Sequence, residues 1–152
     1  MEKYAFDENV VADAIVVQCG DPRFQEIFSK FLREELGVKH PAPISLAGSV
    51  SPVEIPRIAE NHFRTLKNQL HFFLKHFPDA RVVLINHENC KMYESIKQFF
   101  KNKNVLDQEK NDIFLTINII KTLSKTPREI NGFIARVGSN GKSKEVYFDK
   151  IA

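Results

Sequence analysis

Apolar residues follow two different spacings along the chain, and the two spacings alternate. Residues 12–18 and 81–86 are mainly apolar runs, which are typical of short strands buried on both faces of a sheet. Elsewhere apolar residues recur every three to four positions, which predicts amphipathic helices with one buried face. Four segments have this helical spacing: residues 24–32, 55–77, 92–100 and 113–123.

Breaking residues separate these segments. Gly37 is placed to end the first helix, and Pro78 stops the long second one. Residues 43–47 form a shorter strand-like stretch, and the tail after Pro127 has the pattern of two strands joined by a turn at residues 139–141. This order predicts an α/β fold, with a mainly parallel sheet of about four to five strands flanked by helices and a hairpin-like edge.

Length and composition narrow the class of protein. A chain of 152 residues corresponds to one domain, so we expect residues 1–152 to form a single α/β domain. Hydrophobic residues make up 43% and charged residues 27% of the chain, as in soluble globular proteins. Lys and Arg exceed Asp and Glu by 22 to 19, a formal charge of +3. Because this excess is small and not clustered on one face, we expect no nucleic-acid or membrane partner.

Two further features of the sequence predict where in the cell the protein is located. No apolar run approaches the ~18 residues of a membrane span, and the acidic start of the chain has no apolar core of a secretory signal. We therefore expect a cytoplasmic protein. In a reducing compartment the only two cysteines, Cys19 and Cys90, favour metal binding or catalysis over a disulfide.

Both cysteines come at the ends of the two clearest strands. Cys19 directly follows residues 12–18, while His87 and Cys90 follow residues 81–86. In open α/β sheets ligands bind beyond the carboxyl ends of the strands. If the two strands are neighbours, the three side chains meet there. Two thiolates and one imidazole form a good zinc set and leave a fourth position open.

Two charged residues follow Cys19 closely. Asp21 and Arg23 are spaced for a bidentate ion pair, which would keep the carboxylate ionised and available to orient a nucleophile. The alternative is structural: Asp21 before Pro22 has the pattern of a helix N-cap, and Asn89 is a second candidate cap. The histidines at positions 62, 71 and 76 lack the i, i+4 spacing of a helical metal pair, so we interpret them as partly exposed helix residues.

These residues resemble the signature of a known family. Residues 19–23 (Cys-Gly-Asp-Pro-Arg) match the C-x-D-x-R motif of β-class carbonic anhydrases, and residues 87–90 (His-Glu-Asn-Cys) match its H-x-x-C motif. Residues 46–49 (Leu-Ala-Gly-Ser) lie where the family has Asn-Ala-Gly-Asn. The resemblance extends over nearly the whole chain from Ala12 and implies a small member or divergent relative with that fold.

The resemblance also implies an activity. Zn²⁺ is expected on Cys19, His87 and Cys90, and Asp21 with Arg23 is expected to orient a zinc hydroxide that attacks carbon dioxide. The enzyme would be a carbonic anhydrase, a lyase that interconverts carbon dioxide and bicarbonate, working as a homodimer or a larger homo-oligomer. The departures lie around the pocket, where Gly48, Ser49 and Lys91 are expected to form part of the wall: the family has Asn where Ser49 stands and Gly where Lys91 stands.

Three other functions remain open from the sequence. A related zinc hydrolase would act on another small substrate, such as carbonyl sulfide or carbon disulfide. A non-catalytic, regulatory zinc-binding protein could use the same scaffold. A thiol redox protein would pair Cys19 with Cys90, but the chain lacks a C-x-x-C motif and the nearby His87 suits zinc better.

Overall fold

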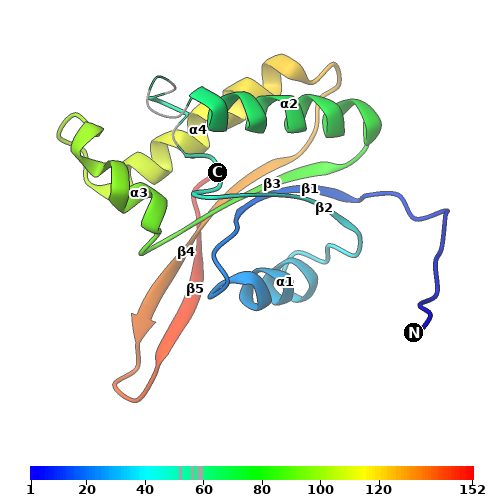
Figure 1. Ribbon diagram of the computed structural model, residues 1–152, viewed down its shortest axis with the longest axis horizontal. Coiled ribbons are helices and arrows are strands. Elements are labelled where there is room, and N and C mark those ends of the chain that lie inside the picture. The colour runs from blue at the N-terminus through cyan, green and yellow to red at the C-terminus, as the bar shows by residue number, and fades with distance from the viewer. Residues whose placement is uncertain (52, 56, 58–59) are drawn as a thin grey trace.

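Five strands form one sheet in the order β2-β1-β3-β4-β5 (Figure 1). The computed structural model describes all residues except 52, 56, 58 and 59. The strands are β1 (Ala14–Cys19), β2 (Pro41–Leu46), β3 (Arg81–His87), β4 (Ile130–Ser139) and β5 (Lys144–Lys150). The first four are parallel to one another and β5 is antiparallel to β4. The prediction of a mainly parallel sheet with a hairpin edge is confirmed.

Helices cover both faces of this sheet. They are α1 (Gln25–Glu34), α2 (Glu60–His76), α3 (Lys91–Ile96), the 3-10 turn η1 (Lys97–Phe99) and α4 (Val105–Leu123). Figure 1 shows α1 on one face, α2 and α4 on the other, and α3 beside the sheet. The long second helix begins later than the apolar spacing predicted: Ile55 lies outside it, and Ala59 lies outside the described residues.

The central strands are apolar because both of their faces are buried. In β1, Ile15 and Val17 contact the apolar cluster under α2 and α4, while Ala14 and Val16 contact the cluster under α1. Alternate residues of a strand point to opposite faces, so a strand between two helical layers needs apolar side chains at every position. At the edge strand β2, by contrast, buried and exposed positions alternate.

The order of the strands brings two strand ends together. β1 and β3 are parallel neighbours, with Gln18 opposite Ile85. This pairing brings Cys19, the last residue of β1, close to His87, the last residue of β3. Among the described residues, none of the helices has the length and apolar character needed to cross a membrane.

Candidate metal centre

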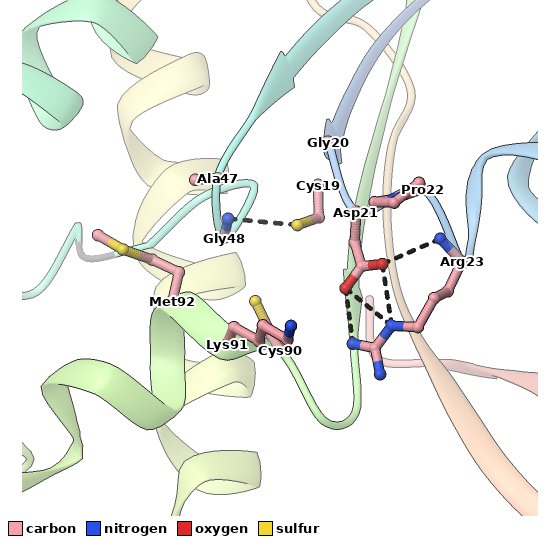
Figure 2. Close-up of a pocket in the computed structure, with 10 residues that line it drawn as sticks. All are labelled: Cys19, Gly20, Asp21, Pro22, Arg23, Ala47, Gly48, Cys90, Lys91 and Met92. Atoms are coloured by element: carbon pink, nitrogen blue, oxygen red, sulfur yellow. Dashed lines mark hydrogen bonds and ion pairs between the residues drawn. The ribbon is translucent and has the colours of Figure 1, made fainter.

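Three buried side chains converge at this edge of the sheet. The two sulfurs of Cys19 and Cys90 and a ring nitrogen of His87 all lie within 4.8 Å of one another, so the three residues could hold a metal ion. Cys19 comes from β1, His87 from β3, and Cys90 is the N-cap of α3. Figure 2 shows both sulfurs at the pocket between these elements.

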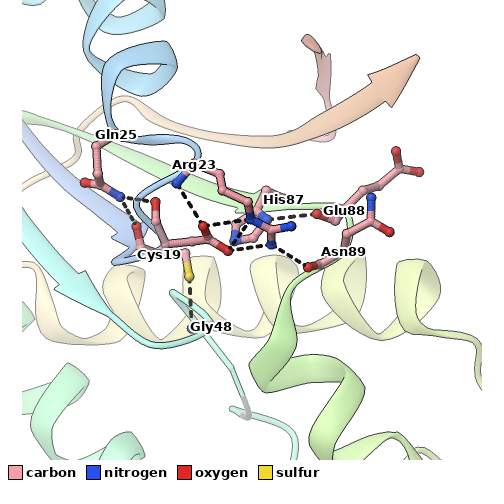
Figure 3. A network of polar contacts seen from close by, with 8 residues as sticks. Cys19, Arg23, Gln25, Gly48, His87, Glu88 and Asn89 are labelled. Atoms are coloured by element: carbon pink, nitrogen blue, oxygen red, sulfur yellow. Dashed lines mark hydrogen bonds and ion pairs between the residues drawn. The ribbon is translucent and has the colours of Figure 1, made fainter. Parts of the chain in front are cut away.

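The surroundings of His87 leave one ring nitrogen ready for a metal. Nδ1 lies 2.9 Å from the carbonyl oxygen of Glu88, which fixes Nδ1 as the protonated donor (Figure 3). Phe24 packs against the ring with centroids 4.1 Å apart. The other nitrogen, Nε2, is buried and has no hydrogen-bond partner among the described residues. A buried acceptor without a partner is costly, and a metal ion on Nε2 would remove that cost.

The two cysteines differ in acidity. A hydrogen bond from the Cys90 thiol, supported by the Gly48 amide, lowers the pKa of Cys19 to about 4 in spite of its burial. The same interaction with the Cys19 thiolate, together with burial, raises the pKa of Cys90 above its usual range. Thiolates are the form of cysteine that binds metals. Cys19 is already in this form and Cys90 would release its proton on metal binding, so this donor set fits a divalent ion such as zinc.

Gly48 supports Cys19 directly. Its amide donates a hydrogen bond to the Cys19 sulfur at 3.3 Å. Its φ of +77° lies in the left-handed region, and a Cβ there would come within 2.8 Å of Met92 Cγ and 2.9 Å of Ser51 Cβ. The backbone can therefore approach the sulfur only because residue 48 has no side chain.

We expect Gly48→Ala to destabilise the fold and to weaken metal binding. Left-handed backbone strain alone costs about 1 kcal/mol, and crowding adds about 1–3 kcal/mol. Gly141→Ala is the matched control, because Gly141 has a φ of +85° and a Cβ added there would have nothing within 4 Å. Urea unfolding and zinc titration of both variants measure the difference. Equal losses in the two variants would contradict a special role for Gly48.

Asp21 and Arg23 form a tight ion pair at the mouth of the site. Arg23 Nη2 lies 2.6 Å from Asp21 Oδ2, and Arg23 Nε lies 3.0 Å from Oδ1. The same Nη2 donates to the carbonyl oxygen of Asn89 at 3.0 Å (Figure 3), which ties the two motifs together. These hydrogen bonds from Arg23 lower the pKa of Asp21 to about 2, so the carboxylate is ionised at any physiological pH.

Neither Asp21 nor Asn89 occupies the N-cap position of a helix. α1 begins at Gln25 with Phe24 as its N-cap residue, and α3 has Cys90 at that position. Asp21 instead accepts a hydrogen bond from the Arg23 amide at 3.0 Å. Asn89 has a φ of +59° in the turn between the two ligand positions.

A pocket of about 410 Å³ opens onto the cysteines. Figure 2 shows the segment after β1 on one side and the start of α3 on the other. Ten residues line it: Cys19, Gly20, Asp21, Pro22, Arg23, Ala47, Gly48, Cys90, Lys91 and Met92. Gly48 and Lys91 are thus among the lining residues. Ser49 does not line the pocket, because its side chain is fully buried beside Gly48.

Supporting contacts that the sequence reasoning missed hold both motifs in place. Gln25 Nε2 donates to the carbonyl oxygens of Cys19 and Asp21 at 2.9 and 2.8 Å. Glu88 accepts hydrogen bonds from the Val137 amide at 2.7 Å and from Arg136 at 2.6 Å. The Glu88 carboxylate thus extends the hydrogen bonding between β3 and β4 beyond His87, where β3 ends. In the sequence, the only signals of these supporting roles are Glu88, the acidic residue inside the H-x-x-C motif, and Gln25, four positions after Asp21.

A buried polar cluster lies between α3 and α4. Asn86 Nδ2 donates to Tyr93 Oη at 3.0 Å, and Tyr93 Oη donates to Asp112 Oδ2 at 3.0 Å. Asn86 immediately precedes His87, and Tyr93 follows Cys90 by three positions. Hydrogen bonds between buried polar groups fix one arrangement of the elements that carry them, so the cluster positions α3 and the cysteine at its start.

Glu109 in this region makes stability depend on pH. Both of its carboxyl oxygens are buried without a partner among the described residues. Burial, and then the charges of Glu88 and Asp112, raise the pKa of Glu109 from 4.5 to about 9. Between these values the folded chain holds one proton more than the unfolded chain. The free energy of unfolding therefore falls as pH rises through this window, by up to about 1.4 kcal/mol per pH unit.

We expect Glu109→Gln to remove this contribution. Relative to the parent, the variant should gain stability between about pH 5 and about pH 9, as measured by urea unfolding at both values. Glu26→Gln, which neutralises an exposed carboxyl group on α1, is the matched control. If the difference between Glu109→Gln and the parent were the same at both pH values, the buried protonated state of Glu109 would be ruled out.

Comparisons with known proteins agree with this architecture. No family model and no curated protein matches the sequence. The crystal structure of β-carbonic anhydrase isoform I from the protozoan Trichomonas vaginalis is similar, with a TM-score of 0.50 and 14% identity over 95% of this chain and 87% of that chain. The β-carbonic anhydrase CafA of the fungus Aspergillus fumigatus has a TM-score of 0.51 and 9% identity, over 90% and 75% of the two chains.

The apo form of a carbon disulfide hydrolase is less similar, with a TM-score of 0.45 and 12% identity over 82% of this chain and 74% of that chain. A TM-score this low carries no argument. Identities this low bear on the fold alone. The sheet order, its flanking helices and the two structural alignments together show that this chain has the fold of the β-carbonic anhydrases.

Proposed function

We propose that this protein is a zinc enzyme that catalyses the reversible hydration of carbon dioxide to bicarbonate. One observation carries the proposal: His87, whose buried Nε2 has no hydrogen-bond partner among the described residues, forms a cluster with two cysteine sulfurs, beside a carboxylate that an arginine keeps ionised. Cys19, His87 and Cys90 would hold Zn²⁺. When bound with an open fourth position, zinc supplies a Lewis acid that lowers the pKa of a coordinated water.

The residues around the cluster supply orientation. The carboxylate of Asp21 can only accept hydrogen bonds, because its low pKa keeps it ionised. It would accept a hydrogen bond from the attacking hydroxide and so aim the oxygen lone pair at the carbon of the substrate. Arg23 holds the carboxylate in place through two of its nitrogens. Orientation of reacting groups accounts for a large part of enzymatic rate enhancement.

The pocket suits a small neutral substrate. Ala47, Met92 and Pro22 contribute apolar surface to its wall. Carbon dioxide is small, linear and without net charge, so such a wall accepts it without the loss of a hydrogen bond.

Stopped-flow measurement of carbon dioxide hydration tests the proposal. The zinc-loaded protein should accelerate hydration, should lose this activity when a chelator removes the metal, and should regain it when zinc is restored. Carbonyl sulfide and carbon disulfide are assayed in parallel by sulfide release. Sulfide release without hydration of carbon dioxide would move the function to that hydrolysis. Full zinc with neither activity would contradict an enzymatic role.

A further inference from the structure

The charges that line the pocket do not balance. Asp21, Arg23 and Lys91 are its charged residues apart from the cysteines. Asp21 and Arg23 neutralise each other in their ion pair. The formal charges of two thiolates and one Zn²⁺ also cancel. Lys91 forms no ion pair with any residue that the structure describes, so the pocket retains one positive charge.

Local structure does not explain a lysine at this position. Lys91 is the first residue of α3, directly after the N-cap Cys90. The positive end of the helix dipole disfavours a cation there. Glu94, the acidic residue of the same first turn, pairs with Lys97 at 3.0 Å instead. A residue that breaks a local rule without a compensating contact is typical of a functional site.

We propose that Lys91 makes this pocket a receptor for a small monovalent oxyanion, which under the proposed function is the product bicarbonate. The lysine ammonium group is a flexible point charge with three donors. Lys91 is exposed, while its neighbour Met92 and Ala47 present apolar surface to the same pocket, so an anion that enters the pocket finds its countercharge in the Lys91 ammonium group. Lys91 thus sets how tightly the pocket retains product and how strongly other anions compete with substrate.

Anion titration of the cobalt-loaded protein tests this role without measuring turnover. Co²⁺ takes the place of zinc, and its visible spectrum reports anions that enter the pocket. Bicarbonate is titrated at constant ionic strength against the parent, Lys91→Met and Lys91→Arg. We expect Lys91→Met to weaken bicarbonate binding by roughly threefold to tenfold, and Lys91→Arg to stay within about twofold of the parent.

Lys75→Met is the matched control for the loss of one positive charge. Lys75 lies exposed in the last turn of α2, away from the residues that line the pocket, so this variant should bind bicarbonate as the parent does. Unchanged binding in Lys91→Met, or an equal loss in Lys75→Met, would overturn the proposal. So would a parent protein that shows no anion response.

The inference rests on the proposed function only for the identity of the anion, and the two can fail separately. Lys91-dependent anion binding in a protein without carbon dioxide turnover would refute the proposed function and leave the anion site standing. Rapid turnover with anion binding that does not depend on Lys91 would refute the anion site and leave the proposed function standing.

Discussion

Cys90→Ser and His87→Ala should each reduce zinc affinity by more than about a hundredfold, beyond the loss typical of a residue that merely supports a ligand. Each substitution removes one of three side chains whose ligand atoms lie within 4.8 Å of one another. Serine keeps the size of Cys90 but does not provide a thiolate, and alanine removes the imidazole altogether. Zinc content after dialysis and competition with a coloured chelator measure the affinity.

His62→Ala is the matched control for this loss. His62 is a half-buried histidine on α2 whose Nε2 lies 3.2 Å from the carbonyl oxygen of Ser49, yet it is outside the cluster. This variant should keep its zinc. Circular dichroism checks that each variant has kept its fold. A folded Cys90→Ser protein that binds zinc as tightly as the parent would refute the proposed ligand set.

Asp21→Asn should leave zinc bound and lower the rate of carbon dioxide hydration by about 10²–10⁴, the range typical of a lost proton-handling group. Asparagine has nearly the same shape, but its amide group is neutral and can donate as well as accept hydrogen bonds. It would no longer hold the attacking oxygen in one orientation, and Arg23 would lose its ionised partner. Stopped-flow rates at matched zinc content measure the effect.

Asp13→Asn provides the comparison. The Asp13 carboxylate also accepts strong hydrogen bonds, from the amides of Lys39 and His40 at 2.7 and 2.9 Å, but it precedes β1, at the opposite end of that strand from Cys19. Its substitution should affect stability and leave the rate per zinc unchanged. A parent-like rate in Asp21→Asn would show that Asp21 has no catalytic role, and loss of zinc in that variant would show a structural one.

Local patterns were enough to predict the strands and most helices. The apolar runs at residues 12–18 and 81–86 are typical of strands buried on both faces, and the structure has two neighbouring strands there. The start of the long second helix was beyond the reach of the periodicity argument, because apolar residues at helical spacing, such as Ile55, do not by themselves show where a helix begins.

The grouping of Cys19, His87 and Cys90 was predictable because the carboxyl ends of parallel strands meet at one edge. Contacts between distant segments were not predictable, since they depend on tertiary packing. The amide of Gly48 reaches the Cys19 sulfur across 29 positions of sequence. The role of Glu88 in pairing with Arg136 likewise became visible only once β4 was placed beside β3.

X-ray absorption at the zinc edge tests the central claim, that two cysteines and one histidine of a single chain hold the metal. The geometry predicts two sulfur neighbours at about 2.3 Å and one imidazole nitrogen at about 2.0–2.1 Å, with a light atom completing the four. A shell of nitrogen and oxygen alone would contradict the claim. So would three or four sulfurs, because the chain has only Cys19 and Cys90 to offer.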